Sequence, residues 1–218
     1  NGTSELLEKG GFNLTKFMSN RPEIIKDLPL EQQAKEMKEF NGERSSKVLG
    51  IGWNMDADAF CFNVKLKNEE LVTKRKMLSV VASIYDPLGL ISPAIMPGKM
   101  LLQRAMKEQI SWDKKVSCEV ADQWKQWLSN IQDAKDMLIC RCVKKNDFDD
   151  ANIELHNFSD ASEKGYGTCH YIRCINKSGQ ISNELLMSKG RVAPSKQMTI
   201  PRLELQAAVL SAQIATMI

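Results

Sequence analysis

The spacing of apolar residues changes twice along this chain, and that change constrains the fold more than any other feature of the sequence. Residues 1–66 read as short alternating elements, and residues 67–149 place apolar side chains at helical spacing. Residues 150–218 begin with strand-like alternation and return to a helical pattern. Separate runs of helices and antiparallel strands are typical of α+β folds. We therefore expect an α+β protein with three segments.

The composition fits a globular protein. Of the 218 residues, 43% are hydrophobic and 26% are charged, which is enough for one large or two modest cores. No apolar run reaches the roughly 18 residues of a membrane span, and the first twenty residues lack a secretory pattern. The six cysteines form no Cys-x-x-Cys pair and the two histidines complete no zinc spacing, so reduced thiols are expected. We expect an intracellular, cytoplasmic protein without a membrane partner.

Local patterns predict the elements of the first two segments. Lys47–Trp53 and Phe60–Leu66 are β-prone runs, and the turn-forming residues between them predict a hairpin. Thr73 can cap a helix. A second helix should follow Pro97, and a third should cover residues 118–134.

The third segment predicts a small sheet followed by a helix. Candidate strands cover residues 153–159, 165–175 and 184–188, with a tight turn at Asn176–Gly179 between the last two. These strands should form an antiparallel meander. Pro201 suits the first turn of a final helix. The apolar stripe of that helix comprises Leu203, Ala207, Leu210, Ile214 and Met217.

Asp160 is the first candidate for chemistry. It is expected at the end of a strand, and the small residues Ala161 and Ser162 leave open space beside its carboxylate for a metal ion and a substrate phosphate. An aspartate after a strand also commonly begins a turn. Asp160 is therefore a candidate metal ligand with a structural alternative.

Glu204 is the second candidate, because it is expected in the first turn of the last helix. It aligns at helical spacing with the small residues Ala208, Ser211 and Ala215, which would let the helix pack closely on the meander. Carboxylates from a strand and a helix are the oxygen ligands that Mg²⁺ prefers, and two-metal phosphodiester cleavage would need further acids. A favourable interaction with the helix dipole is the structural alternative for Glu204.

Two groups of cations are candidates for phosphate contacts, although the net charge of +3 is too small to indicate nucleic acid by itself. The first group stands in the first turn of a helix, where the dipole disfavours positive charge and an external anion could compensate. It comprises Lys74, Arg75 and Lys76. The second group surrounds the third strand and the start of the last helix, and comprises Lys189, Arg191, Lys196 and Arg202. A merely solvated surface is the alternative for both groups.

Five motifs stand in order along the chain: Gly10–Asn20, Lys47–Trp53, Lys76–Pro93, Phe158–Ser162 and Ile200–Ala208. Together they resemble the Bel/Pao class of long-terminal-repeat retrotransposons over nearly the whole chain. The resemblance implies an internal piece of a Pol polyprotein. Residues 1–66 would be the remainder of a reverse transcriptase palm, 67–149 the helical thumb and connection, and 150–218 a truncated N-terminal part of a ribonuclease H-like domain.

The resemblance also implies site roles. Asp160 matches the first-strand metal ligand of ribonuclease H and Glu204 the helix ligand, so both would be catalytic residues. Mg²⁺ or Mn²⁺ would bind only with later acidic ligands beyond Ile218. The site would cut RNA in RNA:DNA hybrids. This piece alone is expected to be inactive, because the catalytic aspartates of the polymerase lie upstream.

Partners follow from the same resemblance. Both cation groups would contact primer-template nucleic acid or the hybrid, and the rest of the Pol polyprotein would be a protein partner. The expected location is a virus-like particle in the cytoplasm, with the nucleus as a second location for the integration complex.

Two other functions stay open. This region of the family also carries the name Pao retrotransposon peptidase, which would make it an aspartic peptidase. Asp160 is followed by Ala161 and Ser162, however, and not by the Ser-Gly or Thr-Gly of a peptidase turn. The other alternative is a non-catalytic segment that only binds nucleic acid or serves as a structural remnant.

Overall fold

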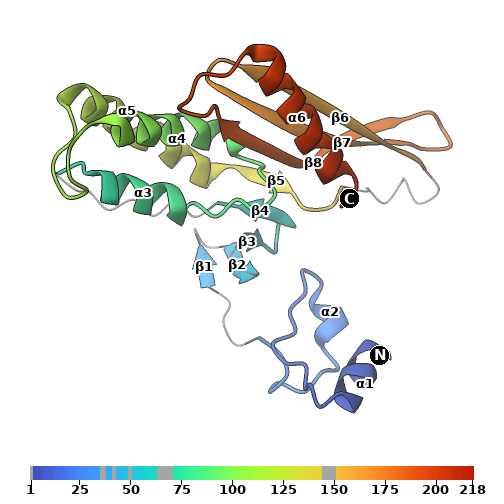
Figure 1. The fold of residues 1–218 in the computed structure, drawn as a ribbon. Coiled ribbons are helices and arrows are strands. Elements are labelled where there is room, and N and C mark those ends of the chain that lie inside the picture. The colour runs from blue at the N-terminus through green and yellow to red at the C-terminus, as the bar shows by residue number, and fades with distance from the viewer. Residues whose placement is uncertain (1, 35–37, 41–42, 49–50, 63–70, 144–150) are drawn as a thin grey trace. The chain divides into compact units, whose positions relative to one another are not determined.

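The computed structural model describes residues 2–34, 38–40, 43–48, 51–62, 71–143 and 151–218 (Figure 1). The chain forms two compact units. The N-terminal unit comprises Asn1–Cys61 with Leu138–Arg141, and the second unit comprises Phe62–Met137 with Cys142–Ile218. The segment boundaries expected at residues 66 and 149 both lie outside the described residues and stay predictions.

The described residues of the N-terminal unit form two short helices and a five-stranded antiparallel sheet. The helices are α1 (Gly2–Lys9) and α2 (Pro22–Ile25). The strands lie in the order β1 (Lys38–Phe40), β2 (Glu43–Val48), β3 (Ile51–Asn54), β4 (Ala59–Cys61) and β5 (Leu138–Cys140). β5 comes from a distant part of the chain and pairs with β4.

The predicted hairpin around residues 54–58 is confirmed. β3 pairs with β4, and Trp53 lies opposite Phe60. The side-chain oxygen of Asn54 accepts hydrogen bonds of 3.0 Å from the backbone N–H groups of Asp56 and Ala57, which explains the tight turn.

The extent of the first hairpin strand was predicted wrongly. Lys47 and Val48 belong to β2, and Val48 lies opposite Ile51 in an antiparallel pair. The run that looked like one strand therefore belongs to two paired strands, and the glycines within it, Gly50 and Gly52, were a signal of interruption that the prediction missed. Residues 63–66 of the second predicted strand lie outside the described residues.

The second unit contains the helices and the meander that the patterns predicted. Its helices are α3 (Lys74–Ser83), α4 (Ser92–Lys107) and α5 (Cys118–Gln132), followed by a 3₁₀ turn at Asp133–Asp136. The meander consists of β6 (Asn152–Ser162), β7 (Gly165–Ile175) and β8 (Ile181–Val192), and the last element is α6 (Ile200–Ala215). This mixture of helices and antiparallel strands confirms an α+β fold. In the described part of the chain, no helix combines the length and apolarity needed to cross a membrane.

The helix starts are set by side-chain caps and by proline. The Thr73 hydroxyl accepts a hydrogen bond of 3.3 Å from the Lys76 N–H, which confirms the predicted cap of α3. α4 begins at Ser92, so the prediction of a start after Pro97 was wrong. Pro93 occupies the first turn, where its missing N–H has no intrahelical partner. Pro97 removes one backbone hydrogen bond from a helix of 16 residues.

A loop between α3 and α4 ties the helices to the sheet. The Asp86 carboxylate accepts hydrogen bonds from the N–H groups of Leu90 (2.9 Å) and Ile91 (3.0 Å), and burial raises the pKa of this carboxyl. The Ser188 N–H of β8 donates to the Leu88 carbonyl at 2.8 Å, and the Ser188 hydroxyl donates to the Gly89 carbonyl. The loop thus runs along the edge of β8.

α6 lies against one face of the meander and contacts β6 and β7 (Figure 1). Four members of its predicted stripe are buried, namely Leu203, Ala207, Leu210 and Ile214. Met217 is 74% exposed because the helix ends at Ala215, so its place in the stripe was predicted wrongly.

Candidate metal and nucleic-acid site

The two faces of the meander contact different helices. A Cβ at Gly165 or Gly190 would lie against the Met96 side chain of α4, so these residues face α4. His170 is fully buried and differs from Gly165 by an odd number of positions along β7, so it lies on the opposite face. α6 contacts β6 and β7 and therefore covers the His170 face.

Asp160 stands on the α4 face in a row with two glycines. It lies opposite Gly167 of β7, and Gly167 lies opposite Gly190 of β8. Directly opposed residues of antiparallel strands point to the same face, so the exposed Asp160 carboxylate has two glycines in its row. A Cβ at Gly190 would lie 3.2–3.3 Å from side-chain atoms of Met96 and Ser92, whereas the three atoms nearest to a Cβ at Gly167 belong to the backbone. Of the two glycines, Gly167 therefore leaves room beside the Asp160 carboxylate. A glycine inside a strand marks a close approach, and this signal in the sequence was missed.

Asp160 lies within β6, which continues to Ser162. The expectation that the strand ends before Asp160 was therefore wrong, because Ala161 and Ser162 pair with Tyr166 and Gly165 of β7. The structural alternative of a turn-forming aspartate is excluded by the same pairing.

Glu204 is exposed on α6 and is the fifth residue of that helix, so its predicted place in the first turn was wrong. The predicted stripe of small residues is only partly buried, since Ser211 is buried and Ala208 is exposed. Asp160 points to the face that α6 does not cover. An ion shared by Asp160 and Glu204 would therefore lie at the outer edge of β6. The described residues contain no group of three or more His, Cys, Asp and Glu side chains placed around one metal position.

The cations at the start of α3 have partners within the protein. Lys74 is buried, and its Nζ donates to the carbonyls of Glu108 (2.7 Å) and Ile110 (2.9 Å), just after α4 ends. The Arg75 guanidinium binds both carboxylate oxygens of Asp113, at 2.7 and 3.0 Å, and this contact raises the pKa of Arg75. Carbonyl groups of the protein, and not the expected external anion, thus compensate the charge of Lys74.

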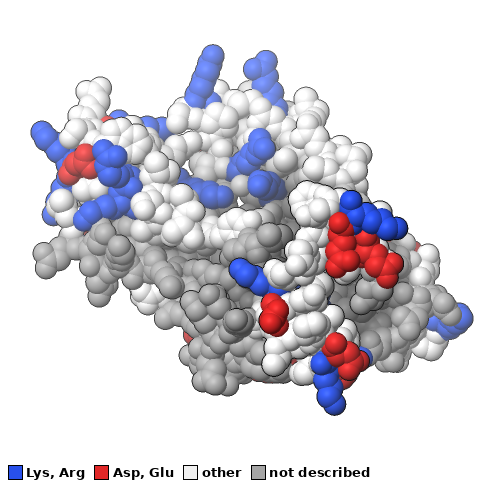
Figure 2. Space-filling model, turned by 90° about the horizontal axis from the view of Figure 1, so that it is seen from below, with Lys and Arg blue, Asp and Glu red and all other residues white. Residues whose placement is uncertain are grey.

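The second cation group lies near the start of α6. Lys189 and Arg191 of β8 lie opposite Thr168 and Tyr166, which places them on the His170 face. Arg202 and Lys196 are exposed, as are Lys189 and Arg191. Lys189 and Arg191 therefore point to the sheet face that carries α6, and Asp160 points to the other face. Figure 2 shows Lys and Arg in several separate groups on the face it presents, some beside Asp or Glu.

The Asp160 face also carries an ion-pair network that sequence reasoning missed. Glu154 accepts a hydrogen bond of 3.0 Å from the His156 Nε2 and one of 2.7 Å from the Arg173 Nη1. The His156 contact, followed by that of Arg173, holds the pKa of the Glu154 carboxyl below its usual range. Alternation along β6 at Glu154, His156 and Asp160 could have placed these side chains on one face.

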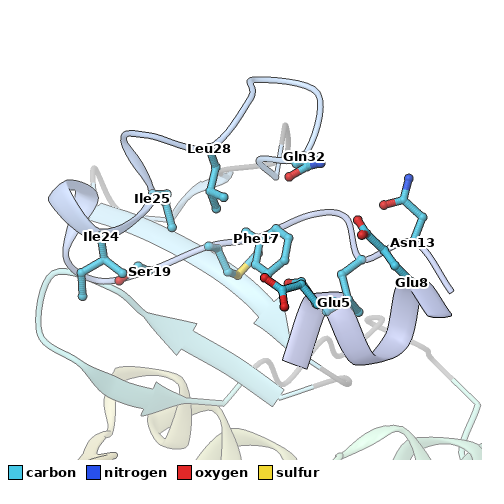
Figure 3. A pocket seen from close by; sticks show the side chains of 12 residues that line it. Glu5, Glu8, Asn13, Phe17, Ser19, Ile24, Ile25, Leu28 and Gln32 are labelled. Atoms are coloured by element: carbon cyan, nitrogen blue, oxygen red, sulfur yellow. The ribbon is translucent and has the colours of Figure 1, made fainter. Parts of the chain in front are cut away.

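The N-terminal unit has an open pocket of about 430 Å³ between α1 and the segment that follows it (Figure 3). Glu5 and Glu8 of α1 line it together with Asn13, Phe17 and Gln32. Glu5 and Glu8 are neighbours on the helix surface because they are three residues apart. None of the predicted site residues lines this pocket.

Comparison with known proteins agrees with the resemblance seen in the sequence. A search of curated proteins returned no match. The family model described as Pao retrotransposon-like RNaseH-like domain matches residues 73–218, from the cap of α3 through the meander to α6. The matched region thus includes α3, α4 and α5 as well as the sheet. Because the match covers well over half of the chain, this protein belongs to the Pao retrotransposon-like RNaseH-like domain family.

Proposed function

We propose that this chain is a segment of a retrotransposon Pol polyprotein that binds RNA:DNA hybrids and primer-template nucleic acid and contributes Asp160 to a metal-dependent ribonuclease H centre. The observation that carries the proposal is the exposed Asp160 carboxylate beside Gly167. Because Gly167 has no side chain, a phosphate can approach β7 next to the carboxylate.

The donor set fits a hard cation. A carboxylate is the oxygen ligand that Mg²⁺ and Mn²⁺ accept, and Asp160 would hold such an ion together with acidic residues from outside the described chain. When bound, the ion polarises a water molecule and neutralises charge on the scissile phosphate. Glu204 joins the site if the ion lies at the outer edge of β6. Arg202, Lys189 and Arg191 would then hold the nucleic-acid backbone on the α6 side.

The test is cleavage of a labelled RNA:DNA hybrid in Mg²⁺ by the Pol polyprotein that carries this chain. Asp160→Asn should abolish cleavage without loss of hybrid binding. Glu163→Gln is the matched control, since Glu163 is exposed in the turn between β6 and β7 and loses the same charge. Unchanged cleavage by Asp160→Asn would sink the proposal. Glu204→Gln decides separately whether the helix carboxylate takes part.

A second function is favoured by one observation. Asp160 points to the sheet face opposite α6, the helix that carries Glu204, which suits a segment that binds nucleic acid without cutting it. Hybrid binding that weakens steeply with salt, with no cleavage by the complete polyprotein, would support this function. The aspartic peptidase has less support, because Asp160 lies within a paired strand and lacks the Ser-Gly or Thr-Gly that should follow.

A further inference from the structure

The sheet face that carries Asp160 also carries an exposed aromatic pair. Phe158 precedes Asp160 by two residues on β6, so both side chains point to the same face. The Phe158 side chain is 56% exposed. Its ring meets the ring of Tyr171 nearly edge-on, with centroids 6.2 Å apart and planes at 76°. The contact with Tyr171 orients the Phe158 ring while more than half of the side chain stays accessible.

A cation stands on the next rung of the same face. Tyr171 lies opposite His156, and Arg173 lies opposite Glu154. The Arg173 guanidinium is fixed by its ion pair with Glu154 at 2.7 Å and keeps 30% of its side chain exposed. Asp160, Phe158, Tyr171 and Arg173 thus follow one another along one surface of β6 and β7.

Neither helix covers this surface. α6 lies on the opposite face. α4 contacts the Asp160 face at Gly165 and Gly190, which lie at the Asp160 end of this surface. An exposed phenylalanine leaves apolar area in water, which costs free energy unless a ligand covers it. On a sheet surface, an aromatic ring beside a guanidinium offers a stacking partner for a base and a charge for a phosphate.

The position relative to Asp160 indicates which ligand fits. Two residues along a strand span about 6.6 Å. A nucleotide whose phosphate stands near the Asp160 carboxylate can therefore reach the Phe158 ring with its own or the adjoining base. Bases inside a duplex are stacked on both faces, whereas an unpaired base has a free face for the ring.

We propose that Phe158, oriented by Tyr171, stacks on an unpaired base of a single-stranded segment that flanks an RNA:DNA hybrid, while Arg173 contacts the backbone of that segment. This inference rests on the proposed function. Stacking tolerates any base, since every base has a π face. The site therefore gives affinity for single-stranded overhangs without sequence preference.

The test measures binding of the 218-residue chain by fluorescence anisotropy in EDTA. The probes are a blunt RNA:DNA hybrid, the same hybrid with a short single-stranded overhang, and that hybrid with abasic sites in the overhang. The wild-type chain should bind the overhang probe about tenfold more tightly than the other two. Phe158→Leu should remove this gain and leave binding of the blunt hybrid unchanged, while Phe158→Tyr should retain it.

Phe12→Leu is the matched control, because Phe12 is 67% exposed in the N-terminal unit and undergoes the same substitution. Thermal unfolding by circular dichroism checks that each variant folds. An overhang gain that survives Phe158→Leu, or that persists with abasic sites, overturns the stacking inference and leaves hybrid binding intact. Absence of binding to every probe by the wild-type chain overturns both the inference and the proposed function.

Discussion

Replacing Gly89 with alanine should destabilise the second unit far more than the same change at a glycine of similar backbone conformation. Gly89 has φ = +71°, which costs an L residue about 1–2 kcal/mol. An added Cβ would lie 2.6 Å from the Ser188 carbonyl carbon and closer still to its oxygen. Both are backbone atoms and cannot rotate away. The loop must shift, which weakens the two hydrogen bonds from Ser188 to Leu88 and Gly89, each contributing about 0.5–1.5 kcal/mol. The total loss is about 2–5 kcal/mol.

Gly179 provides the matched comparison. Its φ is +81°, and an added Cβ there meets nothing within 4 Å, so Gly179→Ala should cost only the backbone penalty of about 1–2 kcal/mol. Urea unfolding gives both free energies from the midpoints and slopes. Tryptophan fluorescence reports on this unit because Trp124 and Trp127 are buried in α5. Equal losses at Gly89 and Gly179 would refute the reasoning, since the contact with Ser188 would then add nothing.

Two further predictions concern buried cationic or titratable groups. Lys74→Met removes both hydrogen bonds from Nζ, so the free energy of unfolding measured in urea should fall by about 1.5–3 kcal/mol. The salt dependence of hybrid binding should stay unchanged. A flatter salt dependence would instead assign Lys74 to the surface that contacts phosphates. Burial lowers the pKa of His170, so below its ordinary value of 6.5 the unfolded chain gains a proton that the folded chain resists. The unfolding free energy should therefore fall as the pH drops from about 7 to 5. This fall should be less steep in His170→Gln than in the wild type or in His156→Gln. Equal slopes in all three proteins would contradict the assignment of the pH dependence to His170.

Local signals predicted the elements that depend on near neighbours in the chain. The Thr73 hydroxyl reaches an N–H only three residues away, and the buried stripe of α6 repeats every three or four residues. The turn at Asn176–Gly179 lies between β7 and β8 as expected, because Gly179 supplies the positive φ that such a turn needs. These features need no knowledge of the rest of the fold.

Features that depend on distant partners were not predictable in the same way. The carbonyls that bind Lys74 lie 34 and 36 residues further along the chain, so its charge looked uncompensated. Alternation alone puts Phe158 beside Asp160, but their exposure depends on which face α6 covers. That choice is made by the packing of α6, and no pattern within Phe158–Ser162 contains it. The sequence alone therefore could not show which face of the meander α6 covers.

The hydrogen bonds that join the α3–α4 loop to β8 have a consequence for the synthesis of this protein. Ser188 and Gly89 are 99 residues apart, and the hydrogen bond from the Gln103 side chain to the Ala193 carbonyl spans 90. Closing such long loops costs chain entropy before the contacts repay it, so these contacts form late. At about 5–20 residues per second, α4 leaves the ribosome roughly 5–20 seconds before β8 does. During that interval the side of α4 that includes Met96 stays exposed to water, which makes it a natural place for a chaperone to bind the nascent chain.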